Sequence, residues 1–117
     1  MNRASLVANV TTQSAQVSLG EKGPVPTAFR AADRPDVFYT VTLANAPTGE
    51  KLDVRCDYRD PSGTVARQIT YTTKTIKTPV WQTHCHYILP SSAPAGAWSV
   101  EMTVENKALR REPFRVE

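Results

Sequence analysis

A strict two-residue alternation is the feature that most constrains this chain. The clearest stretch runs over residues 52–59, where apolar and charged side chains take turns: Leu52, Asp53, Val54, Arg55, Cys56, Asp57, Tyr58 and Arg59. A period of two places successive side chains on opposite faces of an extended strand. The segment is therefore predicted to be a β-strand with one buried and one charged face, and not an amphipathic helix.

Similar patterns recur along the chain and are separated by turn residues. The further segments predicted as strands are Val37–Leu43, Val65–Thr75, Trp81–Leu89, Trp98–Val104 and Leu109–Val116, with weaker candidates at Ser5–Thr11 and Gln16–Leu19. Asp60-Pro61-Ser62-Gly63 has the proline and glycine positions of a tight turn, and Glu105-Asn106-Lys107 reads as another reversal. Residues 20–36 hold five Gly and Pro residues and are predicted to be loop or irregular edge.

Seven or eight short strands with regular turns predict an all-β fold, an antiparallel β-sandwich, with a small closed barrel as the alternative. The 117 residues suit a single domain, in which residues 1–36 form weakly patterned edge strands and loop, and residues 37–117 form the well-patterned core. The core is expected to contain Val41, Leu52, Val54, Cys56, Tyr58, Trp81, Cys85, Tyr87, Trp98, Val100, Met102 and Phe114.

The two cysteines, Cys56 and Cys85, both fall on apolar faces of predicted strands. Two inward-facing cysteines on separate strands favour an inter-sheet disulfide, which would indicate an oxidising compartment. The alternative is a pair of buried free thiols that act as small hydrophobes. A catalytic thiol is not expected, because reactive thiols occupy exposed electropositive pockets.

These core cysteines, together with Trp81 and Trp98, resemble the core of immunoglobulin-like domains. The segment Pro94-Ala95-Gly96-Ala97-Trp98-Ser99-Val100, followed by Pro113-Phe114-Arg115-Val116, is similar to the closing hairpin of many bacterial immunoglobulin-like modules, in which a Gly-x-Trp strand pairs with a final Phe-x-Val strand. The resemblance implies an immunoglobulin-like β-sandwich that serves as an accessory or interaction module in envelope or secreted proteins. It implies no active site.

His84, Cys85 and His86 are consecutive and form the only local cluster of metal-ligating residue types in the sequence. On a strand the two histidines share a face and Cys85 points the other way, so the pair could chelate copper or zinc only with a third ligand from a neighbouring strand. The alternative is that both histidines lie on a solvated sheet face.

Four further residues are candidates for an interaction surface. Phe38 and Ile88 are apolar but fall on outward-facing positions, and Thr70 and Thr72 belong to a threonine row that could contact a protein or a glycan. Exposure of both Phe38 and Ile88 would create an interaction patch, whereas burial of both would indicate a covered sheet.

Composition and charge narrow the function classes. The net charge of +3 is scattered along the chain, which favours a mixed solvated surface over a nucleic-acid-binding face. No stretch is apolar enough to insert into a membrane, and no signal peptide is visible at the start. No catalytic set or cofactor motif was found, so no enzyme activity and no cofactor are expected.

The sequence therefore predicts a non-catalytic module that recognises a protein or a glycan, with self-association as a further option. The alternative is a small metal-binding envelope protein that uses His84 and His86. We expect a periplasmic or secreted location if the Cys56–Cys85 bridge forms, and a cytoplasmic one otherwise.

Overall fold

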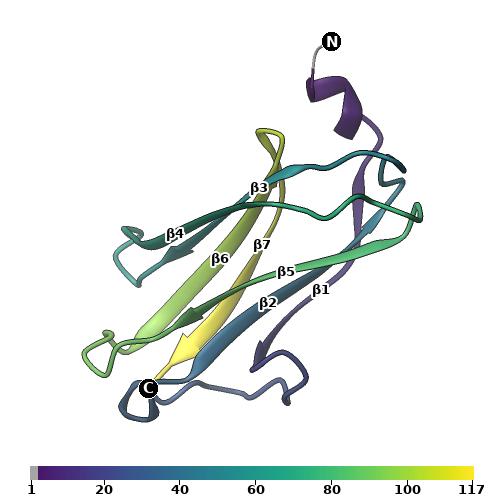
Figure 1. The fold of residues 1–117 in the computed structure, drawn as a ribbon. Coiled ribbons are helices and arrows are strands. Elements are labelled where there is room, and N and C mark those ends of the chain that lie inside the picture. Colours follow the sequence, from purple (N-terminus) through teal and green to yellow (C-terminus); the bar gives the residue numbers. More distant parts are fainter. Residues whose placement is uncertain (1–2) are drawn as a thin grey trace.

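The computed structural model describes residues 3–117 and confirms the immunoglobulin-like β-sandwich. Within the described residues, seven strands and two short 3-10 helices follow one another (Figure 1). In chain order they are η1 (Arg3–Val7), β1 (Thr11–Leu19), η2 (Ala31–Asp33), β2 (Asp36–Ala44), β3 (Asp53–Arg59), β4 (Val65–Thr72), β5 (Trp81–Ile88), β6 (Gly96–Val104) and β7 (Lys107–Val116). Neither of the two helices in residues 3–117 has the length and apolar character needed to cross a membrane.

The strands form two sheets whose neighbours are all antiparallel. One sheet has three strands in the order β1-β2-β5, and the other has four in the order β4-β3-β6-β7. Figure 1 shows the two sheets as the layers of the sandwich. Because the chain passes from one sheet to the other between β2 and β3, between β4 and β5, and between β5 and β6, each sheet contains strands from distant parts of the sequence.

Tight turns set the register where the sequence predicted them. Glu105 and Asn106, the two residues between β6 and β7, have φ angles of 47° and 68°. Positive φ at both central positions is the conformation of a type I′ turn, whose twist suits a two-residue hairpin. At the β3–β4 turn, Gly63 has a φ of 86° and donates its N–H to the carbonyl oxygen of Asp60 over 2.9 Å.

The core lies between the facing sides of the two sheets. On β2 the predicted apolar face is fully buried, with Val37, Tyr39, Val41 and Leu43 all at 0% exposure. Nine of the twelve predicted core residues are buried, and Trp81, Tyr87 and Phe114 are only partly buried but pack against the core. Trp81 and Tyr87 stay partly exposed because β5 is the outer strand of its sheet.

The prediction of a strand over Ser5–Thr11 is wrong. Residues 3–7 form the helix η1, and β1 begins only at Thr11. Val7 and Val10 are both buried, so the segment packs against the end of the sandwich without joining a sheet. The second weak candidate, Gln16–Leu19, is part of β1, which is longer than the sequence pattern indicated.

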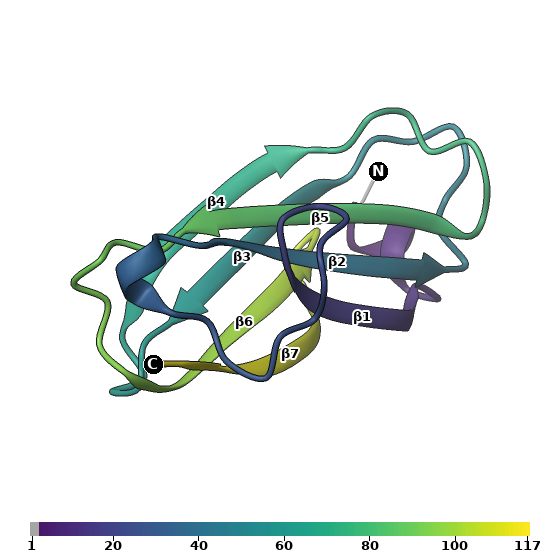
Figure 2. The same cartoon turned by 90° about the horizontal axis from the view of Figure 1, so that it is seen from below.

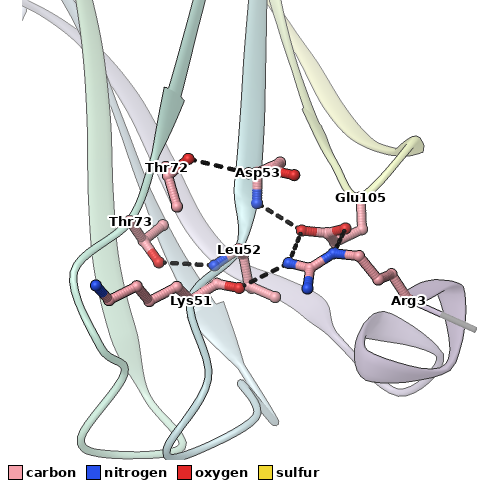
Figure 3. A network of polar contacts seen from close by, with 7 residues as sticks. All are labelled: Arg3, Lys51, Leu52, Asp53, Thr72, Thr73 and Glu105. Atoms are coloured by element: carbon pink, nitrogen blue, oxygen red, sulfur yellow. Dashed lines mark hydrogen bonds and ion pairs between the residues drawn. The ribbon is translucent and has the colours of Figure 1, made fainter. Parts of the chain in front are cut away.

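Two cationic side chains fasten this N-terminal segment. Arg3 makes a two-pronged contact with the carboxylate of Glu105, at 2.7 and 2.8 Å, and donates to the carbonyl oxygen of Lys51 at 2.9 Å (Figure 3). Lys107 donates from Nζ to the carbonyl oxygens of Val7 and Val10 at 3.0 and 2.9 Å. These bonds tie the N-terminal segment to the residues before β3 and to the hairpin between β6 and β7.

Candidate binding surface

The sandwich is open along the side where the two sheets end in β4 and β5. β4 pairs only with β3, and β5 pairs only with β2, so each is an edge strand with one side that has no hydrogen-bonded neighbour. Figure 2 shows β4 and β5 on the same side of the molecule. A groove of about 960 Å³ runs between them and is lined almost entirely by residues of these two strands. We refer to this groove and the free edges of β4 and β5 as the open side.

Apolar and aromatic side chains form the walls of the groove. Ile69 and Tyr71 come from β4, and Trp81 and Tyr87 come from β5, and all four are partly buried. Tyr71 crosses the opening, because its hydroxyl is hydrogen-bonded to the hydroxyl of Thr83 on β5. Burial raises the pKa of Tyr71, while bonds from Thr83 and from the backbone of His84 act in the opposite direction.

The Cys56–Cys85 disulfide lies behind the groove and ties the two sheets together. It connects β3 of one sheet to β5 of the other, with the two Cα atoms 6.6 Å apart, and confirms the predicted pairing. Both residues are buried, and the hydroxyl of Tyr58 lies 3.7 Å from the Cys85 sulfur. Within the described residues there is no free cysteine, so the thiol alternative is not realised.

The alternation of backbone groups along a strand shows which N–H and C=O groups of β4 point toward its free edge. Thr73 donates its backbone N–H to the carbonyl oxygen of Leu52, toward β3, over 2.9 Å. Backbone groups alternate in direction along an antiparallel strand. The N–H and C=O groups of Thr72, Thr70 and Gln68 therefore point away from β3, toward the open side. On β5 the N–H of Leu89 bonds toward Pro35, so the backbone groups of His84 and His86 point outward by the same argument.

The opposite edge of the four-stranded sheet has a different character. β7 carries Lys107, Arg110, Arg111, Glu112, Pro113 and Arg115 within ten residues, and its pairing with β6 contains an irregularity. Charges, proline and bulges are the usual means of protecting an exposed strand edge. Phe29 also covers the end of β7, since it bonds to the backbones of Arg115 and Glu117. β4 holds one charged residue, Arg67, and no proline, and the irregularity in its pairing with β3 lies at its start, where Val65 pairs with Arg59.

The four residues predicted as an interaction surface do not lie together. Phe38 is only 8% exposed and Ile88 is 58% exposed, so the two do not form one patch. Thr70 and Thr72 are exposed on β4, where Thr72 donates its hydroxyl to the carboxylate of Asp53 at 3.0 Å. Thr72 and Ile88 both line the groove, from opposite strands.

The two histidines share the outer face of β5, as the alternation predicted, with Cys85 buried between them. Their rings pack on Phe38, which lies 5.2 Å from the His84 ring and 4.6 Å from the His86 ring, and this stacking explains why Phe38 is covered. His86 also contacts the Asp36 carboxylate through Nδ1 at 2.9 Å. No group of three or more metal-ligating side chains occurs in residues 3–117, so the required third ligand is not supplied.

Sequence reasoning missed the groove itself and the role of Tyr71. Trp81 and Tyr87 were predicted to be core residues. Their side chains do point inward, but they are only partly buried. The side-chain pattern of β4 does not reveal the opening, because Ile69 and Tyr71 point inward as they would on a strand with neighbours on both sides.

Comparison with known proteins supports the fold and goes no further. No family model matches the chain, and no curated protein matches it in sequence. Among solved structures, an immunoglobulin-like protein from Pseudomonas aeruginosa superposes with a TM-score of 0.61 at 16% identity, over 94% of this chain and 98% of that one. The alkylpurine DNA glycosylase AlkC of Pseudomonas fluorescens, bound to DNA with an abasic site analog, gives 0.57 at 17% identity, over 92% of this chain and 30% of that one.

Proposed function

We propose that this chain is a non-catalytic immunoglobulin-like module that binds a protein partner on its open side. The observation that carries the proposal is the contrast between the two edges of one sheet. The β7 edge is charged, contains Pro113 and is partly covered by Phe29, whereas the β4 edge is bare and borders an apolar groove. An unprotected edge is a template for an added strand.

Both components of strand recognition are present at this position. Main-chain groups of Gln68, Thr70 and Thr72 can supply hydrogen bonds to an incoming extended segment, and the groove can receive alternate side chains of that segment. In such complexes the main-chain bonds provide affinity and the pockets provide specificity. The β4 edge carries a single charged residue, Arg67, and no proline, so its outward main-chain groups remain available for this mode of binding.

A non-catalytic role is supported by the state of the reactive groups. Both cysteines are joined in the disulfide, so residues 3–117 hold no free thiol that could act as a nucleophile. The same disulfide supports action in an oxidising compartment, such as the periplasm or the extracellular space, because cytosolic reductants keep most thiols reduced. We therefore propose that the module acts outside the cytoplasm.

The test uses one substitution that alters only the edge. In Thr70→Pro the outward N–H is lost and no bond to β3 is removed, because proline is tolerated where the N–H of an edge strand faces solvent. The native chain already places Pro113 on the edge strand β7. Arg111→Pro on β7 is the matched control, since it introduces the same residue on the opposite edge.

Random twelve-residue peptides displayed on phage would be selected on the wild-type protein, and the enriched peptides titrated against both variants. We expect the selected peptides to lose at least tenfold in affinity on Thr70→Pro and to bind Arg111→Pro as they bind the wild type. Melting curves confirm that both variants are folded. If Thr70→Pro does not fold, Thr70→Lys replaces it. Peptides that bind all folded variants equally, or no enrichment, would contradict the proposal.

A further inference from the structure

The charges around the groove are of one sign. Two cations, Arg67 and Lys74, line it together with His84 and His86, and the lining contains no carboxylate. Both cations are exposed, and within residues 3–117 neither forms an ion pair. Two acidic side chains contact residues of the groove: Asp53 accepts from the Thr72 hydroxyl, and Asp36 contacts His86. The lining of the groove therefore carries a net positive charge.

The two cations lie at opposite ends of the groove. Arg67 pairs with Tyr58 across the β3–β4 ladder, and the Tyr58 ring lies 5.3 Å from that of Tyr87, which places Arg67 at the Tyr87 end. Tyr71 contacts Thr83, so the chain beyond it, which includes Lys74, continues toward Trp81. Residues 67 and 74 are separated by roughly 23 Å at a strand rise of about 3.3 Å per residue.

Between these charged ends, the inward-facing side chains of β4 are apolar. Ile69 and Tyr71 point inward from β4, on the same face of the strand as Arg67, because the inward residues alternate with the outward ones. A strand that lies along β4 therefore meets, on its groove-facing side, the cation Arg67 and then two apolar positions. Lys74 follows beyond the end of β4 and lines the groove at that end. Each position of this row has a chemical complement in a short segment with alternate side chains directed into the groove.

We infer that the partner segment is an extended strand of about seven residues with a carboxylate near each end and apolar side chains between them. This inference rests on the proposed function, because it specifies the ligand of the same open side. Arg67 and Lys74 would fix the position of the segment along β4, and Ile69, Tyr71 and Trp81 would contact its apolar residues. The backbone groups of β4 would supply the hydrogen bonds.

Three synthetic peptides test the charge pattern directly. The probe is Ac-Glu-Thr-Val-Thr-Val-Thr-Glu-NH2, which directs two carboxylates and two valines to one face. The first control replaces both glutamates by lysine. The second control has the same composition but exchanges the glutamates with the two valines. Binding is followed by the fluorescence of Trp81, in a Trp98→Phe background if needed, and by amide shifts in a ¹⁵N-labelled sample.

The probe is expected to bind about tenfold more tightly than the lysine peptide at low salt, because each of two exposed ion pairs contributes a few-fold in affinity. At 0.5 M salt it should lose much of this advantage, because salt screens exposed charges. The exchanged peptide should bind more weakly than the probe. Arg67→Gln and Lys74→Gln should each reduce probe binding about two- to fivefold. Lys107→Gln is the control and should not affect probe binding, because Lys107 lies at the start of β7 and donates to the Val7 carbonyl oxygen.

Four results would overturn the inference. Equal binding of the probe and the lysine peptide would remove the acidic requirement and leave the edge-binding function intact. Binding of the phage-selected peptides without any binding of the probe at millimolar concentration would have the same meaning. Amide shifts confined to β1 or β7 would place the ligand elsewhere. A dimer of the unliganded protein at micromolar concentration that Thr70→Pro makes monomeric would identify a second copy as the occupant.

Discussion

Glu105 connects three parts of the chain that lie far apart in sequence. Its carboxylate receives Arg3 from the N-terminal helix and the backbone N–H of Asp53 from the start of β3, and its own position is fixed by the turn between β6 and β7 (Figure 3). The side chain is only 5% exposed. A buried carboxylate with charged and backbone donors is more stable in its ionised form.

This contact predicts a measurable loss of stability in acid. The hydrogen bonds from Arg3 hold the pKa of Glu105 below its ordinary value of 4.5. A carboxyl whose pKa is lower in the folded state contributes stability above its unfolded pKa and loses it as the pH falls through the folded pKa. Urea unfolding between pH 6 and pH 2 should therefore show falling stability below about pH 4.5, with a shallower fall in Glu105→Gln and in Arg3→Gln. Identical pH profiles for all three proteins would contradict this role.

Trp98 is the second residue whose removal gives a specific prediction. It is 3% exposed, packs 6.0 Å from the Phe114 ring and donates its indole N–H to the Pro94 carbonyl oxygen over 2.8 Å. Trp98→Ala should cost about 3–5 kcal/mol of unfolding free energy, as a large core truncation does. Trp98→Phe should cost less, because it keeps an aromatic ring. Urea denaturation measures both, and a loss below about 1 kcal/mol for the alanine variant would contradict the core assignment.

At the scale of elements, the strands with strict alternation were predictable and the N-terminal segment was not. β2 and β3 follow from their own residues, because one face of each is apolar. The helix η1 depends on contacts that sequence spacing does not reveal, including the bonds from Lys107 to the carbonyls of Val7 and Val10. The strand expected at Ser5–Thr11 was wrong because its two buried valines are three residues apart, which suits a 3-10 turn and not a strand.

The disulfide gives a prediction at the same scale, since it joins β3 to β5 across a separation of 29 residues. Closing a loop of this size restricts the unfolded chain, so the double variant Cys56→Ala with Cys85→Ala should lose about 3–4 kcal/mol of stability. The purified wild type should have a mass about 2 Da below that of the reduced chain, as expected for two hydrogens lost per bridge. Equal stability of oxidised and double-variant protein in urea would show that the bridge does not stabilise the fold.

At the scale of the whole molecule, sequence patterning was sufficient for the architecture but not for the site. Alternation identifies which residues face the interior, and this is why the sandwich and the inward cysteines could be predicted. It does not say which strands end a sheet. Trp81 and Tyr87 were expected in the core and instead line the groove, because the strand order leaves β4 and β5 without outer neighbours. The candidate binding surface is thus a property of topology.

The central claim is that β4 has a free edge on which a partner strand is added. Amide hydrogen exchange of ¹⁵N-labelled protein, measured with and without the tightest phage-selected peptide, tests it most directly. We predict fast exchange at Gln68, Thr70 and Thr72 in the free protein, slow exchange at Ile69 within the ladder, and at least tenfold slower exchange at the three outward amides once the peptide is bound. Unchanged exchange at these amides in the saturated complex would contradict the account.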